Sequence, residues 1–190
     1  ELICTAADAI AAGHHNDQFP LRVWQTGSGT QTNMNINEVI SNMASQSSGT
    51  ALGCHSPVHP NDHVNRSQST NDVFPAAIHV AAAKQLKDAL LPALDALVLA
   101  FDVKAQAWMP IVKIGRTHLQ DAVPLRLGDE VAAWRDQLKQ AQAWLKACLV
   151  SLGDLPLGGT AVGTGLNTPP GFRHAVAEEL SRVAGVEVHP

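Results

Sequence analysis

Four segments of the sequence combine small polar side chains with glycine or histidine, and each could take part in chemistry on an anion. In the first segment, residues 26–33, Ser28 and Thr30 come just before a predicted helix. The free backbone N–H groups at the start of a helix, together with neighbouring hydroxyls, suit a carboxylate. Serine and threonine also cap helices where no ligand binds, so this alternative stays open.

The second segment, residues 59–65, lies among histidines whose spacing could suit a metal. His55, His59 and His63 are four residues apart, as ligands on one face of a helix would be. Pro57 and Pro60 disfavour a continuous helix there, so the spacing does not predict a metal site. An asparagine–aspartate pair after proline is also ordinary turn chemistry.

The third segment, residues 67–72, precedes the longest predicted helix. Ser69, Thr70 and Asn71 place hydroxyl and amide groups beside a second positively polarised helix end. Capping alone would account for one such cluster. Two clusters of this kind indicate one site for a small polyanion.

The fourth segment, residues 113–121, contains His118. This histidine is the best candidate for a general acid or base, because histidine titrates near neutral pH. A histidine at the surface or in a structural hydrogen bond is the alternative. Residues 158–167 are also glycine-rich, but no lysine follows the glycines as it does in a P-loop, so this loop could simply connect two helices.

Helices must position these segments, because helical periodicity dominates the rest of the sequence. Pro92 lies inside the longest periodic stretch and should kink it. Residues 109–123 are expected to form an irregular connection, and no segment shows a convincing strand pattern. The expected helices span residues 2–13, 32–47, 71–107, 125–152 and 172–184.

This pattern predicts an all-α fold, a bundle of long helices. The helices are longer than one small globule needs, which leads to the hypothesis that several subunits share the bundle. The chain has 190 residues, of which 45% are hydrophobic and 16% charged, as in a folded globular protein.

Charge and cysteine content exclude several classes of protein. The net charge of −4 argues against a general nucleic-acid binder, which needs a clustered basic surface. No apolar run is long enough to span a membrane. Three cysteines cannot form a fully paired disulfide framework, and they indicate a reducing compartment. We expect the cytoplasm, or the mitochondrial matrix if the protein is eukaryotic.

Taken together, these segments resemble the class II fumarases, the iron-independent fumarate hydratases of the aspartase/fumarase superfamily. The resemblance covers essentially the whole chain, in the family's order and spacing. Thr117–His118 distinguishes this sequence from the aspartate ammonia-lyases, which typically carry glutamine at the histidine position, and Phe74–Pro75 is also typical of fumarases. The matching segments are residues 27–35, 59–65, 67–75, 115–121 and 158–167.

The resemblance implies a reversible, metal-free addition of water to fumarate, which gives L-malate through an aci-carboxylate intermediate without a cofactor. It implies that His118 transfers a proton on the hydroxyl side of the substrate. It also implies that six hydroxyl or amide side chains hold substrate carboxylates or water: Ser28, Thr30, Ser69, Thr70, Asn71 and Thr117. A second dicarboxylate site is implied at His59, Asn61 and Asp62.

The family's enzymes are homotetramers with much longer chains, and three subunits build each active site. By this resemblance, residues 1–66 would end an N-terminal domain and residues 67–190 would begin the central long-helix domain. The serine usually assigned as the base and a carboxylate-binding lysine belong to a loop outside this sequence, so we expect this chain alone to be inactive. Another lyase of the superfamily, such as aspartate ammonia-lyase, and a non-catalytic helical assembly fragment are the alternatives.

Overall fold

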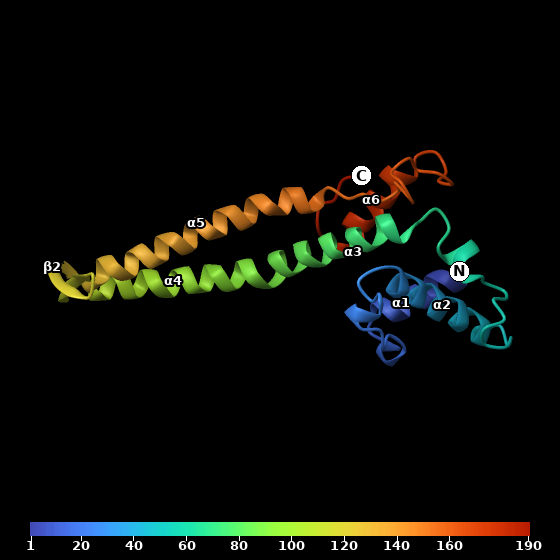
Figure 1. Ribbon diagram of the computed structural model, residues 1–190, viewed down its shortest axis with the longest axis horizontal. Coiled ribbons are helices and arrows are strands. Elements are labelled where there is room, and N and C mark those ends of the chain that lie inside the picture. Colours follow the sequence, from blue (N-terminus) through green and yellow to red (C-terminus); the bar gives the residue numbers. More distant parts are fainter. The chain divides into compact units, whose positions relative to one another are not determined.

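The computed structural model describes residues 1–190. Most of the chain is helical, and a short hairpin joins two long helices (Figure 1), so the all-α prediction is confirmed. The elements are α1 (Leu2–Ala11), η1 (Asn16–Gln18), η2 (Val23–Gln25), α2 (Thr30–Ser47), η3 (Pro60–Val64), α3 (Thr70–Gln85), η4 (Leu86–Leu90), α4 (Leu91–Trp108), β1 (Val112–Thr117), β2 (Gln120–Arg126), α5 (Leu127–Gly153) and α6 (Phe172–Ala184).

The chain divides into two compact units. The first contains residues 1–79, 155–183 and 188–190, and the second contains residues 80–154 and 184–187. The first unit therefore joins the early polar segments to the glycine-rich loop near the end of the chain. The predicted domain boundary between residues 66 and 67 concerns the architecture of longer relatives and stays a prediction.

Small polar residues on α2 let a loop pack closely against this helix in the first unit. The Ser41 hydroxyl donates to the Val58 carbonyl at 2.6 Å, and the Ser45 hydroxyl donates to the Ser56 carbonyl at 3.1 Å. Both serines are at most 1% exposed. Their hydroxyls thus satisfy carbonyls that lie at a close helix–loop contact, and they fix the loop that leads into η3.

The longest helical stretch changes its geometry just before Pro92. The α-helical turns of α3 widen to a π-helix at η4 and return to α-helix in α4, with Pro92 in the first turn of α4. Proline has no N–H, and its ring crowds the carbonyl of the preceding turn, so a regular α-helix cannot continue through it unchanged. The structure accommodates Pro92 with a widened turn before it, and the predicted kink stays a prediction.

The expectation of an irregular connection is wrong for most of residues 109–123. β1 and β2 pair as an antiparallel hairpin, with Val112 opposite Arg126 and Thr117 opposite Gln120. No residue of either strand is fully buried, and Pro124 lies within β2. Without a buried face there is no alternation of apolar and polar residues, which explains why the sequence pattern does not reveal the strands.

Helices α4 and α5 lie side by side and run antiparallel in the second unit (Figure 1). Two buried or half-buried polar links join them. Arg135 Nη1 contacts Asp102 Oδ1 at 2.6 Å, and the Gln142 side-chain amide donates to Asp95 at 2.6 Å. Hydrogen bonds to Asp136 and Asp102 also raise the pKa of Arg135. These directional contacts fix the register of the two helices.

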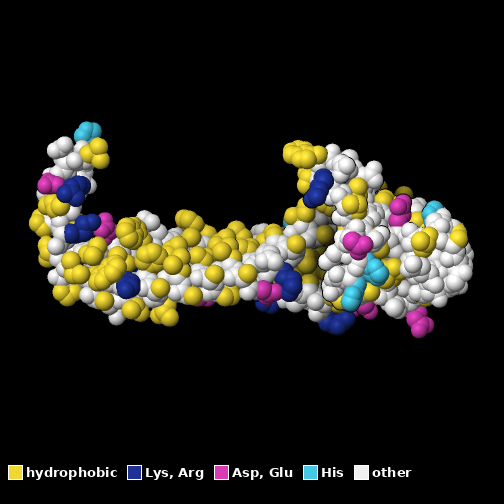
Figure 2. Space-filling view, turned by 90° about the horizontal axis from the view of Figure 1, so that it is seen from below, with side chains coloured by type: hydrophobic (Ala, Val, Ile, Leu, Met, Phe, Trp, Pro, Cys, Tyr) yellow, Lys and Arg dark blue, Asp and Glu magenta, His cyan; other side chains and the backbone are white.

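Large hydrophobic side chains remain exposed along these long helices (Figure 2). Leu99 is 65% exposed on α4, and Trp144 is 65% exposed on α5. Such a surface is typical of an interaction face rather than of a monomer's exterior. None of the helices combines the length and apolar character that a membrane span requires.

Gly128, near the start of α5, is expected to be essential for the approach of α4. A Cβ atom at this position would lie 2.4 Å from the Ala105 carbonyl oxygen and 2.8 Å from the Met109 nitrogen. Gly128→Ala should therefore destabilise the protein by about 1–3 kcal/mol through overpacking, despite the better helix propensity of alanine. Thermal unfolding would measure the loss, with Ala133→Ser on the exposed face of α5 as control. A melting temperature at or above that of the wild type would contradict the clash.

Candidate functional site

Four segments of the first unit line an open cleft of about 1230 Å³. They are the start of α2, η3 with the turn after it, the start of α3, and residues 160–172. Five residues singled out from the sequence line the cleft: Thr30, Asn61, Asp62, Ser69 and Thr70. The structure thus brings together parts of three motifs that lie far apart in the sequence, and their side chains are hydroxyls, an amide and a carboxylate.

A hydrogen-bonded group of asparagines joins three of these segments. Asn33 Nδ2 donates to Asn65 Oδ1 at 3.2 Å and to Thr70 Oγ1 at 3.0 Å. Asn37, which is 5% exposed, also donates to Asn65 Oδ1, at 3.1 Å. Asn33 and Asn65 line the cleft, but sequence reasoning assigned them no role. Both asparagines lie within the polar segments, at residues 26–33 and 59–65, and this position in the sequence could have identified them as candidates.

At the start of α2, no side chain caps the helix. Gly29 is the N-cap residue and no side-chain capping bond is present, so simple capping does not explain Ser28 and Thr30. The Thr32 hydroxyl instead donates to the Gly27 carbonyl at 2.7 Å. Ser28 and Thr30 are both exposed. Their hydroxyls and the positive end of the helix are therefore available to a negatively charged ligand.

At the start of α3, capping does occur. The Asn71 N–H donates to Ser69 Oγ at 3.2 Å, and the Ser69 N–H donates to Asp72 Oδ1 at 2.9 Å. This reciprocal arrangement is a capping box, which satisfies donors that the helix itself leaves open. The Asn71 side chain turns to the glycine-rich loop and donates to the Ala161 carbonyl at 2.8 Å.

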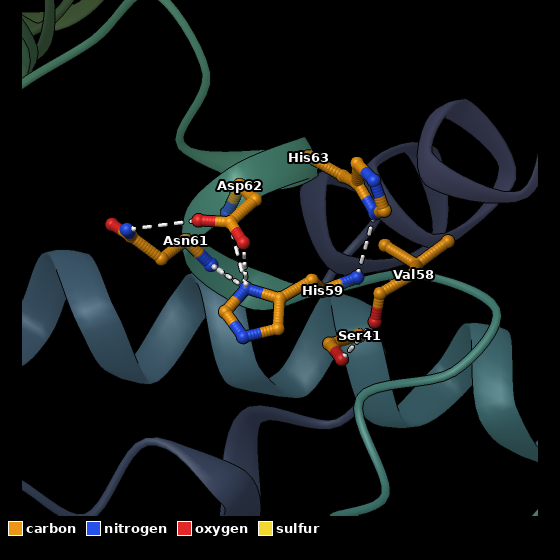
Figure 3. Close-up of polar contacts among 6 residues, drawn as sticks. All are labelled: Ser41, Val58, His59, Asn61, Asp62 and His63. Carbon is orange, nitrogen blue, oxygen red and sulfur yellow. Dashed lines mark hydrogen bonds and ion pairs between the residues drawn. The ribbon is translucent and has the colours of Figure 1, made fainter.

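His59 caps η3, as Figure 3 shows. Its Nδ1 accepts from the Asn61 N–H at 3.2 Å and from the Asp62 N–H at 3.1 Å. His63 Nδ1 accepts from the His59 N–H at 2.9 Å. Because His59 Nδ1 acts as an acceptor it carries no proton, so the Asp62 carboxylate 3.5 Å away is not bonded to it through a hydrogen. The proton of neutral His59 is on Nε2, where it can serve as a donor.

Thr117 and His118 lie at the tip of the hairpin, in the second unit, whereas all residues that line the cleft belong to the first. The two central residues of the turn, His118 and Leu119, have φ of 49° and 60°. Both values are in the left-handed region that such turns usually fill with asparagine or glycine. A tight hairpin turn needs this conformation at both central positions, so the backbone alone does not distinguish His118 from Leu119.

Cys54 lies outside the cleft but is expected to be the most reactive thiol. Hydrogen bonding with the Ser56 backbone, and next with the Thr50 side chain, lowers the pKa of Cys54, and the residue is exposed. The thiolate is the nucleophile, so Cys54 should be alkylated several-fold faster than the other exposed cysteines near neutral pH. Limited iodoacetamide labelling and peptide mass spectrometry would test this, with Cys4 and Cys148 as internal controls. Equal labelling of the three would contradict it.

Comparison with known proteins places the chain in one enzyme family. A family model described as lyase matches residues 1–190. The class II fumarate hydratase of Parasynechococcus marenigrum is 65% identical over 189 residues, which cover 100% of this chain and 41% of that protein. The class II fumarate hydratase of Chromobacterium violaceum is 55% identical, over 97% of this chain and 40% of that protein. The chain thus spans about two fifths of the length of these relatives.

Solved structures of related lyases share the fold of this chain. The class II fumarase of Schistosoma mansoni superposes with a TM-score of 0.91 at 43% identity, over 97% of this chain and 38% of that one. A fumarate lyase:delta crystallin of Brucella melitensis superposes with a TM-score of 0.88 at 40% identity, over 98% of this chain and 40% of that one. The chain therefore belongs to the lyase family, and the relatives to which it is similar are class II fumarases.

Proposed function

We propose that this chain is part of a class II fumarate hydratase, which adds water to fumarate reversibly and gives L-malate. The observation that carries the proposal is the cleft, where the starts of α2 and α3 present Thr30, Ser69 and Thr70. Two helix starts and several neutral donors suit a dianion with two carboxylates. The 65% identity to a class II fumarate hydratase supports the same substrate.

The reaction divides into two steps, written here from malate. A base removes the proton from the carbon beside one carboxylate, and the electron pair moves into that carboxylate to give the aci form. The carbon–oxygen bond of the neighbouring carbon then breaks, the double bond forms, and the departing hydroxyl takes a proton and leaves as water. Hydrogen-bond donors fixed around the aci-carboxylate are the main expected source of the rate enhancement.

The roles of the residues are those that the resemblance implies, and of these residues Thr30, Ser69 and Thr70 also line the cleft. Ser28, Thr30, Ser69, Thr70, Asn71 and Thr117 would hold the carboxylates or water, and His118 would transfer the proton at the hydroxyl. The base and the carboxylate-binding lysine would come from sequence outside this chain. No step of this scheme calls on a metal or a cofactor.

The second dicarboxylate site would lie at the start of η3, with His59, Asn61 and Asp62. The Nδ1 atom of His59 is occupied by two backbone N–H groups, so its Nε2 is the atom left to donate to a carboxylate. The Asn61 amide binds Asp62 Oδ1 at 3.2 Å. This site would therefore be a weak one, because it pairs few donors with the negative charge of Asp62.

We further propose a homotetramer whose active sites are shared between subunits. The exposed hydrophobic side chains of α4 and α5 support this, because a buried helix bundle would cover them (Figure 2).

The decisive experiment is a substrate panel on a complete protein that carries this chain. Interconversion of fumarate and malate, followed by ultraviolet absorbance, is expected. Release of ammonia from aspartate without dehydration of malate would overturn the proposal in favour of an aspartase-like lyase. The 20.1 kDa chain itself is expected to show no turnover. Robust turnover at that mass would show that the residues present suffice and that the base lies among them.

A further inference from the structure

Asp72 is a buried carboxylate to which the proposed reaction gives no role. It is 1% exposed and lies in the first turn of α3. Its Oδ1 accepts from the Ser69 N–H at 2.9 Å. Its Oδ2 accepts from the Gly158 N–H at 3.1 Å and from the Thr160 N–H at 2.8 Å. One side chain therefore joins the start of α3 to a loop 86 residues later in the sequence.

The carboxylate is held by backbone groups alone. Asp72 forms no ion pair, and its three donors are peptide N–H groups. Burial of a charge without such bonds is strongly unfavourable, whereas hydrogen bonds to an ionised oxygen are stronger than those between neutral groups. The burial of Asp72 thus depends on the exact spacing of the two segments, and the spacing depends in turn on Asp72.

Both segments that Asp72 joins line the cleft. Ser69 and Thr70 belong to one wall, and Thr160 and Ala161 belong to another. The Asn71 side chain adds a bond to the Ala161 carbonyl at the outer edge of this contact. The position of one wall relative to the other is therefore set by Asp72 at the centre and by Asn71 at the rim.

The glycine-rich loop adopts a conformation that needs such a fixed contact. Thr160 is a β-branched residue with φ of 56°, which is strained, and its buried hydroxyl has no hydrogen-bond partner. Gly158 has φ of 81°, and a Cβ atom there would lie 2.4 Å from Arg173 Cγ. Strained conformations persist only where the surroundings determine them, and the two bonds from Gly158 and Thr160 to Asp72 are such a determinant.

We propose that Asp72 is a positioning residue: it holds residues 158–161 against the start of α3 at the spacing that a dicarboxylate in the cleft requires. Its effect on fumarate hydration rests on the function proposed above. A shift of about 1 Å in groups that position a substrate can lower the rate roughly a hundredfold. A looser contact between these two segments should therefore lower the rate of the reaction. Asp72 itself need not touch the substrate.

The test is Asp72→Asn in the complete enzyme. Asparagine keeps the shape but replaces one acceptor oxygen by an NH2 group, which would face a backbone N–H. Amide hydrogen exchange by mass spectrometry would report on residues 157–163, and kcat and KM would be measured per folded molecule. The matched control is Asp88→Asn, which removes the negative charge from an exposed contact of 2.7 Å to Lys84 and lies in the second unit.

For Asp72→Asn we expect exchange in residues 157–163 to accelerate about tenfold or more, and kcat/KM per folded molecule to fall roughly 10–100-fold. Asp88→Asn should change neither. A purely structural role would reduce the folded fraction but leave kcat and KM of the folded molecules as in the wild type. That result, or unchanged exchange in the loop, would overturn the proposal.

If Asp72→Asn does not fold, Asp72→Glu gives the same decision, since it keeps the charge but moves the oxygens by one methylene. Faster loop exchange with lower kcat/KM would support positioning, and wild-type kinetics would overturn it. A wild-type enzyme without activity on fumarate would overturn the proposed function and the kinetic part of this inference together. The exchange measurement would still decide whether Asp72 holds the loop.

Discussion

His118→Asn in the complete enzyme is expected to lower kcat by roughly 10²–10⁴-fold, the usual effect of removing a proton-transfer group. Folding should remain nearly intact. His118 is exposed at the tip of the hairpin and has φ of 49°, a conformation that asparagine adopts more readily than most residues. The substitution thus removes the titrating ring while it preserves the turn. Steady-state kinetics and circular dichroism would measure the two effects.

Leu119→Asn is the matched control for this substitution. Leu119 occupies the other central position of the same turn, has φ of 60° and is 95% exposed. It carries no titrating group, so its replacement should leave kcat within a few-fold of the wild type. A large loss of kcat in both variants would show that the loss comes from a changed turn and not from the missing histidine ring. Near-wild-type kcat in His118→Asn would show that this histidine does not transfer the proton.

The helices could be predicted from the sequence because apolar residues recur every three or four positions along them, as on one face of a helix. The stretch expected at residues 172–184 coincides with α6, and the helix expected at 125–152 matches α5 within two residues at either end. The hairpin could not be predicted in this way. Its strands pair only with one another and bury no side chain fully, so the apolar pattern that reveals a strand is absent.

The candidate site shows a similar division. Polar motifs at helix starts pointed to Thr30, Ser69 and Thr70, and these residues do line one cleft. The sequence alone could not assign a role to Asp72. Its carboxylate accepts hydrogen bonds from the N–H groups of Gly158 and Thr160, which are far away in the sequence and come close only in the folded chain. A capping residue and a positioning residue look alike in sequence. Here one carboxylate does both, with one oxygen for each task.

Asn71→Ala in the complete enzyme should lower kcat/KM by roughly 10²–10³-fold, which is typical for the loss of one fixed donor to a developing negative charge. Asn71 also donates to the Ala161 carbonyl at 2.8 Å, so the substitution will cost about 1 kcal/mol of stability as well. The question is whether the loss of activity comes from the missing donor or only from a loosened loop. Kinetics per folded molecule, together with thermal unfolding, would measure both.

Asn42→Ala separates the two explanations. Asn42 on α2 also fixes a loop through one bond of 2.8 Å, between its Oδ1 and the Gly53 N–H, and neither residue lines the cleft. Both variants should lose similar stability, but only Asn71→Ala should lose activity. If kcat/KM of Asn71→Ala stayed within a few-fold of the wild type, Asn71 would be a loop anchor and not a substrate ligand. The cleft would then recognise its dicarboxylate through the hydroxyls of Thr30, Ser69 and Thr70 and the helix starts that carry them.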